Sequence, residues 1–165
     1  TASARVKLTA GAGLWPAFWV LGTERWPATG EMDILENVGD PAWTNFVLHG
    51  PGYSGDTPLG SRQHFPGGGD ITGWHVYSMD WTADALVFRV DGAERYRVTR
   101  PMVEKYGRWA YDTPKYLIAN MAIGGQYPQN VNHTTAPYPG LPQAAVDLIK
   151  AGRATMLVDW VRVSK

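Results

Sequence analysis

Short stretches of alternating apolar and polar residues, separated by Gly, Pro and Asp, make up most of this chain. A two-residue period is typical of β-strands with one buried face. Strands are predicted at residues 3–8, 17–21, 32–38, 45–48, 76–81, 86–90, 94–98, 116–121 and 155–163. Residues 117–121 and 156–163 are apolar at nearly every position, which predicts strands covered on both faces.

The clearest local prediction is a hairpin over residues 85–98, where Asp91 and Gly92 separate two alternating runs. Asp-Gly supplies the positive φ angles of a two-residue hairpin turn. Helical patterns are scarce: one turn at 101–106, and a helix at 142–151 that Gly152 would cap. Residues 50–73 and 124–142 are predicted to be long loops. The pattern therefore predicts one all-β sandwich of two antiparallel sheets, decorated by loops.

Composition narrows the function classes. The 165 residues suffice for a core that buries about two-thirds of the chain's surface. Fifteen basic and fifteen acidic residues cancel, so nothing suggests a nucleic acid or an acidic membrane surface as partner. Cysteine is absent, which excludes disulfides, thiolate zinc sites and cysteine nucleophiles. Eight Trp and eight Tyr suit flat, hydroxylated ligands such as sugars.

Three carboxylates interrupt the otherwise apolar strand at 30–37, namely Glu31, Asp33 and Glu36. Glu31 and Asp33 share a face, but an ideal strand would point Glu36 into the core. A β-bulge near residues 34–35 would bring all three to one face. Glu31 and Glu36 would then be roughly 13 Å apart along the strand, leaving a carboxyl gap of roughly 5–7 Å. That gap brackets the ~5–5.5 Å of retaining glycosidases without excluding the inverting geometry.

Asp33 has a natural role between the two glutamates, because a neighbouring carboxyl keeps their pKa values apart. The strand pattern alone leaves two other interpretations open. The acids could form a solvated strand face, or they could bind a cation.

The surrounding motifs resemble glycoside hydrolase family 16, in its laminarinase-like branch. They comprise the acidic pattern, the tryptophan-rich approach at 13–27, the segment at 48–55, and the segments at 74–81, 90–92, 118–125 and 158–163. The resemblance covers nearly the whole chain. The one-residue-longer acidic pattern is typical of the laminarinase branch, whereas lichenases have the shorter, unbulged form.

The resemblance implies a jelly-roll sandwich with a concave substrate cleft and retaining endo-hydrolysis of β-1,3-glucan, without a catalytic cofactor. Glu31 would be the nucleophile, Glu36 the general acid/base and Asp33 their helper. The implied substrate-binding residues are Trp15, Trp19, Trp26 and His49, with Asn45, Tyr53, Asn120 and Tyr127 as further sugar contacts. Trp15 and Trp19 share a strand face, for which the core is the alternative to the cleft.

Other functions stay open on this scaffold: a transglycosylase, a mixed-linkage β-glucanase, or a glucan-binding module that cleaves nothing. The family also suggests a structural calcium ion at Asp159, for which an exposed strand aspartate is the plain alternative. Calcium takes six to eight oxygens, so Asp159 alone is not a site. The family resemblance also implies that the protein is secreted.

The length itself raises one expectation. Catalytic domains of this family are longer than 165 residues, and residues 4–8 resemble a strand well inside them. A sandwich without its N-terminal strands would expose sheet edges and core. We therefore expect a complementary piece of roughly 80–100 residues, from the same domain, to complete the sandwich.

Overall fold

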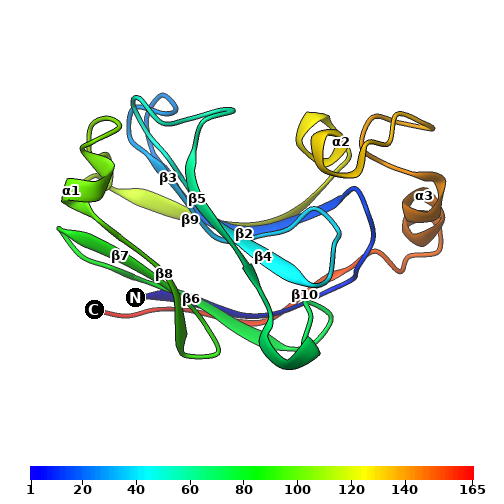
Figure 1. Ribbon diagram of the computed structural model, residues 1–165. Helices are drawn as coiled ribbons and strands as arrows, with labels where there is room; N and C mark the ends of the chain where they lie inside the picture. The colour runs from blue at the N-terminus through cyan, green and yellow to red at the C-terminus, as the bar shows by residue number, and fades with distance from the viewer.

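The computed structural model describes residues 1–165 as two five-stranded antiparallel sheets packed face to face (Figure 1). One sheet has the order β10 (Met156–Val163), β1 (Ala2–Leu8), β6 (His75–Trp81), β7 (Ala85–Val90) and β8 (Ala93–Thr99). The other has the order β5 (Leu59–His64), β4 (Trp43–His49), β3 (Glu31–Glu36), β2 (Leu14–Gly22) and β9 (Lys115–Ile123). The predicted two-sheet sandwich is confirmed.

Three short helices and one 3₁₀ turn decorate the sheets. They are α1 (Arg100–Val103), α2 (Gln126–Asn132), α3 (Gln143–Lys150) and η1 (Pro66–Gly68). Figure 1 shows α2 and α3 together at one end of the molecule and α1 at the other. None of the helices is long and apolar enough to cross a bilayer.

The core lies between the sheets and contains 22 buried residues. In β1 the alternation is complete, because Ala2, Ala4, Val6 and Leu8 are buried while the residues between them are partly exposed. Phe46 of β4 meets Phe88 of β7 across the two layers, with ring centroids 5.2 Å apart. Period-two patterning therefore places one face of each central strand in the core.

Two local predictions are confirmed by the backbone. Asp91 and Gly92 have φ angles of 51° and 79° and join β7 to β8 as a two-residue turn. The predicted C-terminal helix is present as α3, and Gly152 follows it with a φ of 66°.

Besides the 3₁₀ turn η1, one strand and one helix lie where long loops are predicted. β5 pairs with β4 along its whole length, but its sequence after Leu59 is polar or glycine, so it offers no apolar face to recognise. α2 is only seven residues long, contains Pro128, and starts directly after Gly124 and Gly125. Neither segment carries the periodic signal on which strand and helix prediction depends.

The prediction that β9 and β10 are covered on both faces is wrong. Each is the last strand of its sheet. Because Phe46 of β4 packs on Phe88 of β7, the β5 edge of one sheet lies over the β8 edge of the other, and β9 and β10 lie together at the opposite edge. Val158 and Val161 are in register with the buried Val6 and Ala4, yet they are 40% and 48% exposed. Ile123 of β9 is 53% exposed. The apolar residues of these strands therefore line an open side of the molecule.

Candidate active site

The three acidic residues of β3 share one face of the sheet because of a β-bulge. Residues 18 and 19 of β2 pair with residues 35 and 33, which leaves Ile34 as the extra residue of β3. The pairing with β4 shifts between the same positions. Ile34 and Leu35 are both fully buried, whereas Glu31 and Glu36 are only partly buried. The predicted bulge is thus present, and Glu36 leaves the core.

Glu31 is held by an indole group. Trp26 Nε1 donates a hydrogen bond of 2.6 Å to Glu31 Oε2. Burial raises the pKa of Glu31, and the hydrogen bond from Trp26 opposes that rise. Gly30 precedes Glu31 with a φ of 76°, and a Cβ there would lie 2.7 Å from the Ala110 carbonyl oxygen. Only glycine therefore fits at position 30, directly before Glu31.

Glu36 has a matching arrangement at the other end of β3. Trp15 Nε1 donates to Glu36 Oε1 over 3.0 Å, and Asn45 Nδ2 donates to Oε2 over 3.5 Å. Burial raises the pKa of Glu36, the hydrogen bonds from Trp15 and Asn45 lower it, the charge of Glu31 raises it and Arg62 lowers it. Each glutamate consequently has its own tryptophan donor.

Asp33 lies between the two glutamates and is buried. Burial, reinforced by the charges of Glu36 and Glu31, raises its pKa well above the ordinary aspartate value. Its Oδ2 has no hydrogen-bond partner and lies 3.9 Å from His49 Nε2. Asp33 therefore keeps its proton to higher pH than an exposed aspartate does.

His49 ends β4 and lies opposite Glu31, with its Nε2 3.7 Å from Glu31 Oε1. Burial lowers the pKa of His49, which favours the neutral imidazole. Glu31, Asp33 and His49 also form the one group of three side chains in the molecule whose oxygen and nitrogen atoms lie close enough to share a cation, within 4.8 Å of one another. The ring of His49 lies 5.8 Å from that of Trp26.

The remaining aromatic and amide candidates surround the two glutamates. Trp15 and Trp19 are partly exposed on the carboxylate side of β2 and are not core residues. The Trp15 and Tyr127 rings meet edge to face at 5.4 Å, and Asn45 Nδ2 lies 3.4 Å from the Tyr127 hydroxyl. Trp19 Nε1 donates to Asn120 Oδ1 over 2.8 Å. The structure thus brings together every predicted sugar contact except one.

That exception is Tyr53, whose prediction as a sugar contact is wrong. Its side chain belongs to the hydrophobic core and is 1% exposed. The hydroxyl donates to the Arg108 carbonyl oxygen over 3.0 Å. A tight turn, in which Gly50 and Tyr53 form a β-bridge, directs the ring inward.

Asp159 lies in β10, on the sheet that does not carry the glutamates. Its carboxylate accepts a hydrogen bond of 2.7 Å from Arg5 Nη1. An arginine thus already supplies the positive charge there, and no other acidic side chain joins Asp159 in a cluster of metal ligands. Calcium at Asp159 therefore stays a prediction, and it would compete with Arg5 for the carboxylate.

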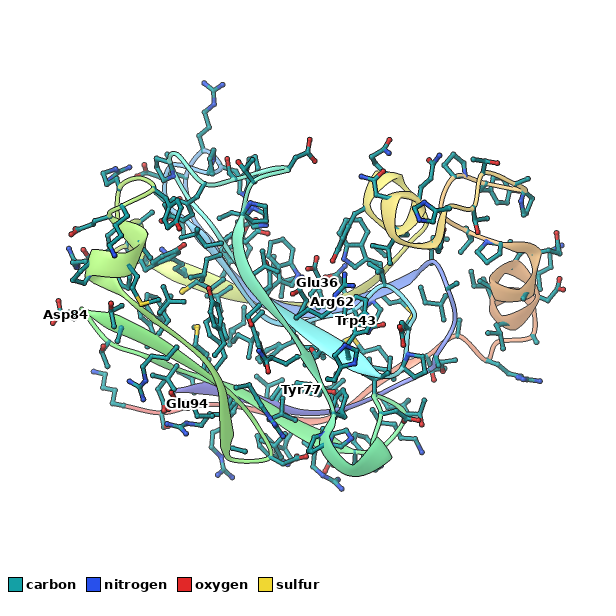
Figure 2. The ribbon with its side chains drawn as sticks, in the orientation of Figure 1. Glu36, Trp43, Arg62, Tyr77, Asp84 and Glu94 are labelled. Carbon is teal, nitrogen blue, oxygen red and sulfur yellow. The ribbon has the colours of Figure 1, made fainter.

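Arg62 is a residue near the glutamates that the sequence pattern does not reveal. It lies in the polar strand β5, and its guanidinium carbon is 3.9 Å from the centroid of the Trp43 ring. Figure 2 shows Arg62 and Trp43 beside Glu36. A charged residue in a segment without periodicity gives no sign of which strand it will join.

Comparison with known proteins agrees with this site. The family model "Glycosyl hydrolases family 16" matches residues 1–140. The chain is 33% identical to "Glucan endo-1,3-beta-glucosidase A1" of Niallia circulans and 32% identical to "Beta-glucanase" of Rhodothermus marinus, over 98% and 96% of its length. Its fold matches the endo-β-1,3-glucanase structure from Pyrococcus furiosus with a TM-score of 0.79 and 36% identity over 98% of the chain.

The chain spans 23% and 54% of the two curated relatives, and 59% of the solved glucanase chain. The family match nevertheless includes β3, its bulge and all three acidic residues. This chain belongs to glycosyl hydrolase family 16.

Proposed function

We propose that this chain carries the catalytic centre of a retaining endo-β-1,3-glucanase. The observation that carries the proposal is the bulged strand β3, which holds Glu31, Asp33 and Glu36 on one face. Each glutamate has a separate indole donor, and between them lies Asp33, whose pKa is raised by burial and by the charges of the two glutamates. The relatives named as β-1,3-glucanases support the same substrate class.

In the first half of the reaction, Glu31 attacks the anomeric carbon while Glu36 gives its proton to the departing glycosidic oxygen. Burial raises the pKa of both glutamates, which favours the protonated Glu36, and the hydrogen bond from Trp26 opposes that rise at the nucleophile. In the second half, Glu36 takes a proton from the water that releases the glycosyl-enzyme. The hydrogen bonds from Trp15 and Asn45 then stabilise its carboxylate form. The two side chains supply the nucleophile and both proton transfers, so the chemistry uses no cofactor.

The test is the loss of laminarin cleavage in Glu31→Gln and Glu36→Gln, measured as reducing ends, with circular dichroism to verify the fold. Glu94→Gln is the matched control, because Glu94 lies on β8 in the other sheet. Both glutamine variants lose activity and the control keeps it. Near-normal rates from either active-site variant contradict the assignment.

Product analysis decides between hydrolysis and the other reactions of this scaffold. Glucose oligomers from laminarin indicate the hydrolase, whereas longer chains indicate a transglycosylase. Cleavage of a mixed-linkage glucan at a comparable rate indicates the broader β-glucanase. A protein that binds laminarin and releases no reducing ends is a binding module.

The proposal includes a complementary polypeptide of roughly 80–100 residues that adds strands beside β9 and β10. The exposed Val158, Val161 and Ile123 support it. Intact mass and denaturing gels of the natural protein test for the second piece. The 165-residue chain alone should bind a hydrophobic dye, and the completed domain should not. A monomeric 165-residue chain that is active and binds no dye contradicts it.

Two further implications of the family, calcium binding and secretion, are tested separately. Calcium at Asp159 requires displacement of Arg5, so equal melting temperatures in excess calcium and in chelator exclude it. Secretion is tested by measuring glucanase activity in the culture medium of the source cells.

A further inference from the structure

Arg62 reaches the site through three aligned strands. It pairs with Asn45 of β4, and Asn45 in turn pairs with Glu36 of β3. Residues directly opposite each other in antiparallel strands point to the same face. Arg62, Asn45 and Glu36 therefore form a row across one face of the sheet, and Figure 2 shows Arg62 next to Glu36.

The guanidinium group of Arg62 is tethered but has no ion-pair partner. It lies over the Trp43 ring at 3.9 Å, and Trp43 itself is 2% exposed beneath it. Burial raises the pKa of the Tyr127 hydroxyl, and the nearby Arg62 opposes that rise. No carboxylate lies within ion-pair distance of Arg62. Its positive charge is thus held in place and not neutralised.

The charges around Glu36 make this cation significant. Two carboxyl groups, Glu31 and Asp33, lie on the same strand, and His49 at the end of β4 favours its neutral form. Tyr127 from α2 contributes a neutral hydroxyl. Arg62 is the one cation whose charge acts on Glu36. Without it, every charge acting on Glu36 would favour the protonated carboxyl, which suits the first half of the reaction and hinders the second.

We propose that Arg62 is a positioning residue whose fixed charge keeps Glu36 able to ionise. The inference rests on the proposed function. Glu36 alternates between acid and base only if neither form is trapped. The flat guanidinium suits this task, because stacking on the Trp43 ring fixes the position of its charge.

The test compares Arg62→Gln with Arg62→Lys, and uses Arg97→Gln on β8 as a control of equal charge change. The pH dependence of kcat/KM on laminarin is measured at low ionic strength. We expect the alkaline limb of Arg62→Gln to move up by about half a pH unit, since Arg62 is exposed and solvent screens its charge. Arg62→Lys keeps the limb near its original position, and Arg97→Gln leaves it unchanged.

A second measurement is independent of activity. The carboxyl ¹³C shift of Glu36 is titrated by NMR in the original protein and in Arg62→Gln, where the pKa should rise by about half a unit, or threefold in the dissociation constant. Equal pKa values, or a Lys variant that shifts as much as the Gln variant, overturn the inference. A protein that shows the pKa rise but cleaves no laminarin sinks the proposed function and leaves the role of Arg62 intact.

Discussion

Replacing Trp26 with Phe is the sharpest test of how the nucleophile is kept ionised. The variant keeps an aromatic ring beside His49 but loses the 2.6 Å hydrogen bond from Nε1 to Glu31 Oε2. If Trp26 serves only as a stacking surface, substrate binding alone will suffer. If its N–H group stabilises the carboxylate, the pKa of Glu31 will rise.

The magnitude follows from the strength of such bonds. A hydrogen bond to a charged group contributes about 1.5–3 kcal/mol. Trp26 is 45% exposed, so water replaces part of the lost interaction. We therefore take a net loss of about 1 kcal/mol, which corresponds to about 0.7 pKa units. The shift is upward, because the lost bond stabilised the ionised form.

The assay is the pH profile of kcat/KM on laminarin, whose acidic limb reports ionisation of the nucleophile in the free enzyme. The limb should move to higher pH in Trp26→Phe. Trp19→Phe is the matched control, since Trp19 Nε1 donates to Asn120 and to no carboxylate. An acidic limb that stays in place in Trp26→Phe, while KM rises as in the control, refutes the reasoning.

Other expectations concern stability. Phe88→Ala should lower the free energy of unfolding by about 3–5 kcal/mol in denaturant titrations, because Phe88 is fully buried against Phe46, whereas the exposed Tyr106→Ala should change it by less than about 0.5 kcal/mol. Asp33 has a raised pKa when folded, so its contribution is full at low pH and is lost as pH rises above about 4, the ordinary aspartate value. Asp33→Asn should therefore raise the melting temperature at pH 7 and have little effect near pH 3; the same gain at both pH values contradicts this. Lys115 Nζ donates to the carbonyl oxygens of Thr29, Ala110 and Thr113, so Lys115→Met should destabilise the protein by about 1–3 kcal/mol, and an unchanged melting temperature contradicts that role.

The bulge and the shared face of the acids could be predicted because they break a local rule. Glu36 in an apolar strand has the wrong phase for solvent, and a single extra residue is the simplest correction. The Asp91-Gly92 turn was equally predictable, since few residue pairs accept positive φ at both positions.

Other features depend on topology, which local patterns do not contain. Val158 and Val161 have the composition of a covered strand, and only the strand order reveals that β10 has a neighbour on one side alone. Arg62 lies near Glu36 only because both residues are in register with Asn45, each from a neighbouring strand. Tyr53 lies only four residues after His49 of the site, yet the tight turn between them directs its ring into the core.

The extra residue in β3 has a consequence for how such a site can diversify. Removal of Ile34 would restore a strict two-residue period, in which the three acids still alternate with apolar residues on one face. The strand can therefore lose this one residue in evolution without pointing its acidic side chains into the core. What changes is the spacing between the two glutamates and the shape of the floor beneath the sugar. A one-codon change of length in β3 would thus change the distance between the two glutamates while all three acids stay on one face of the sheet.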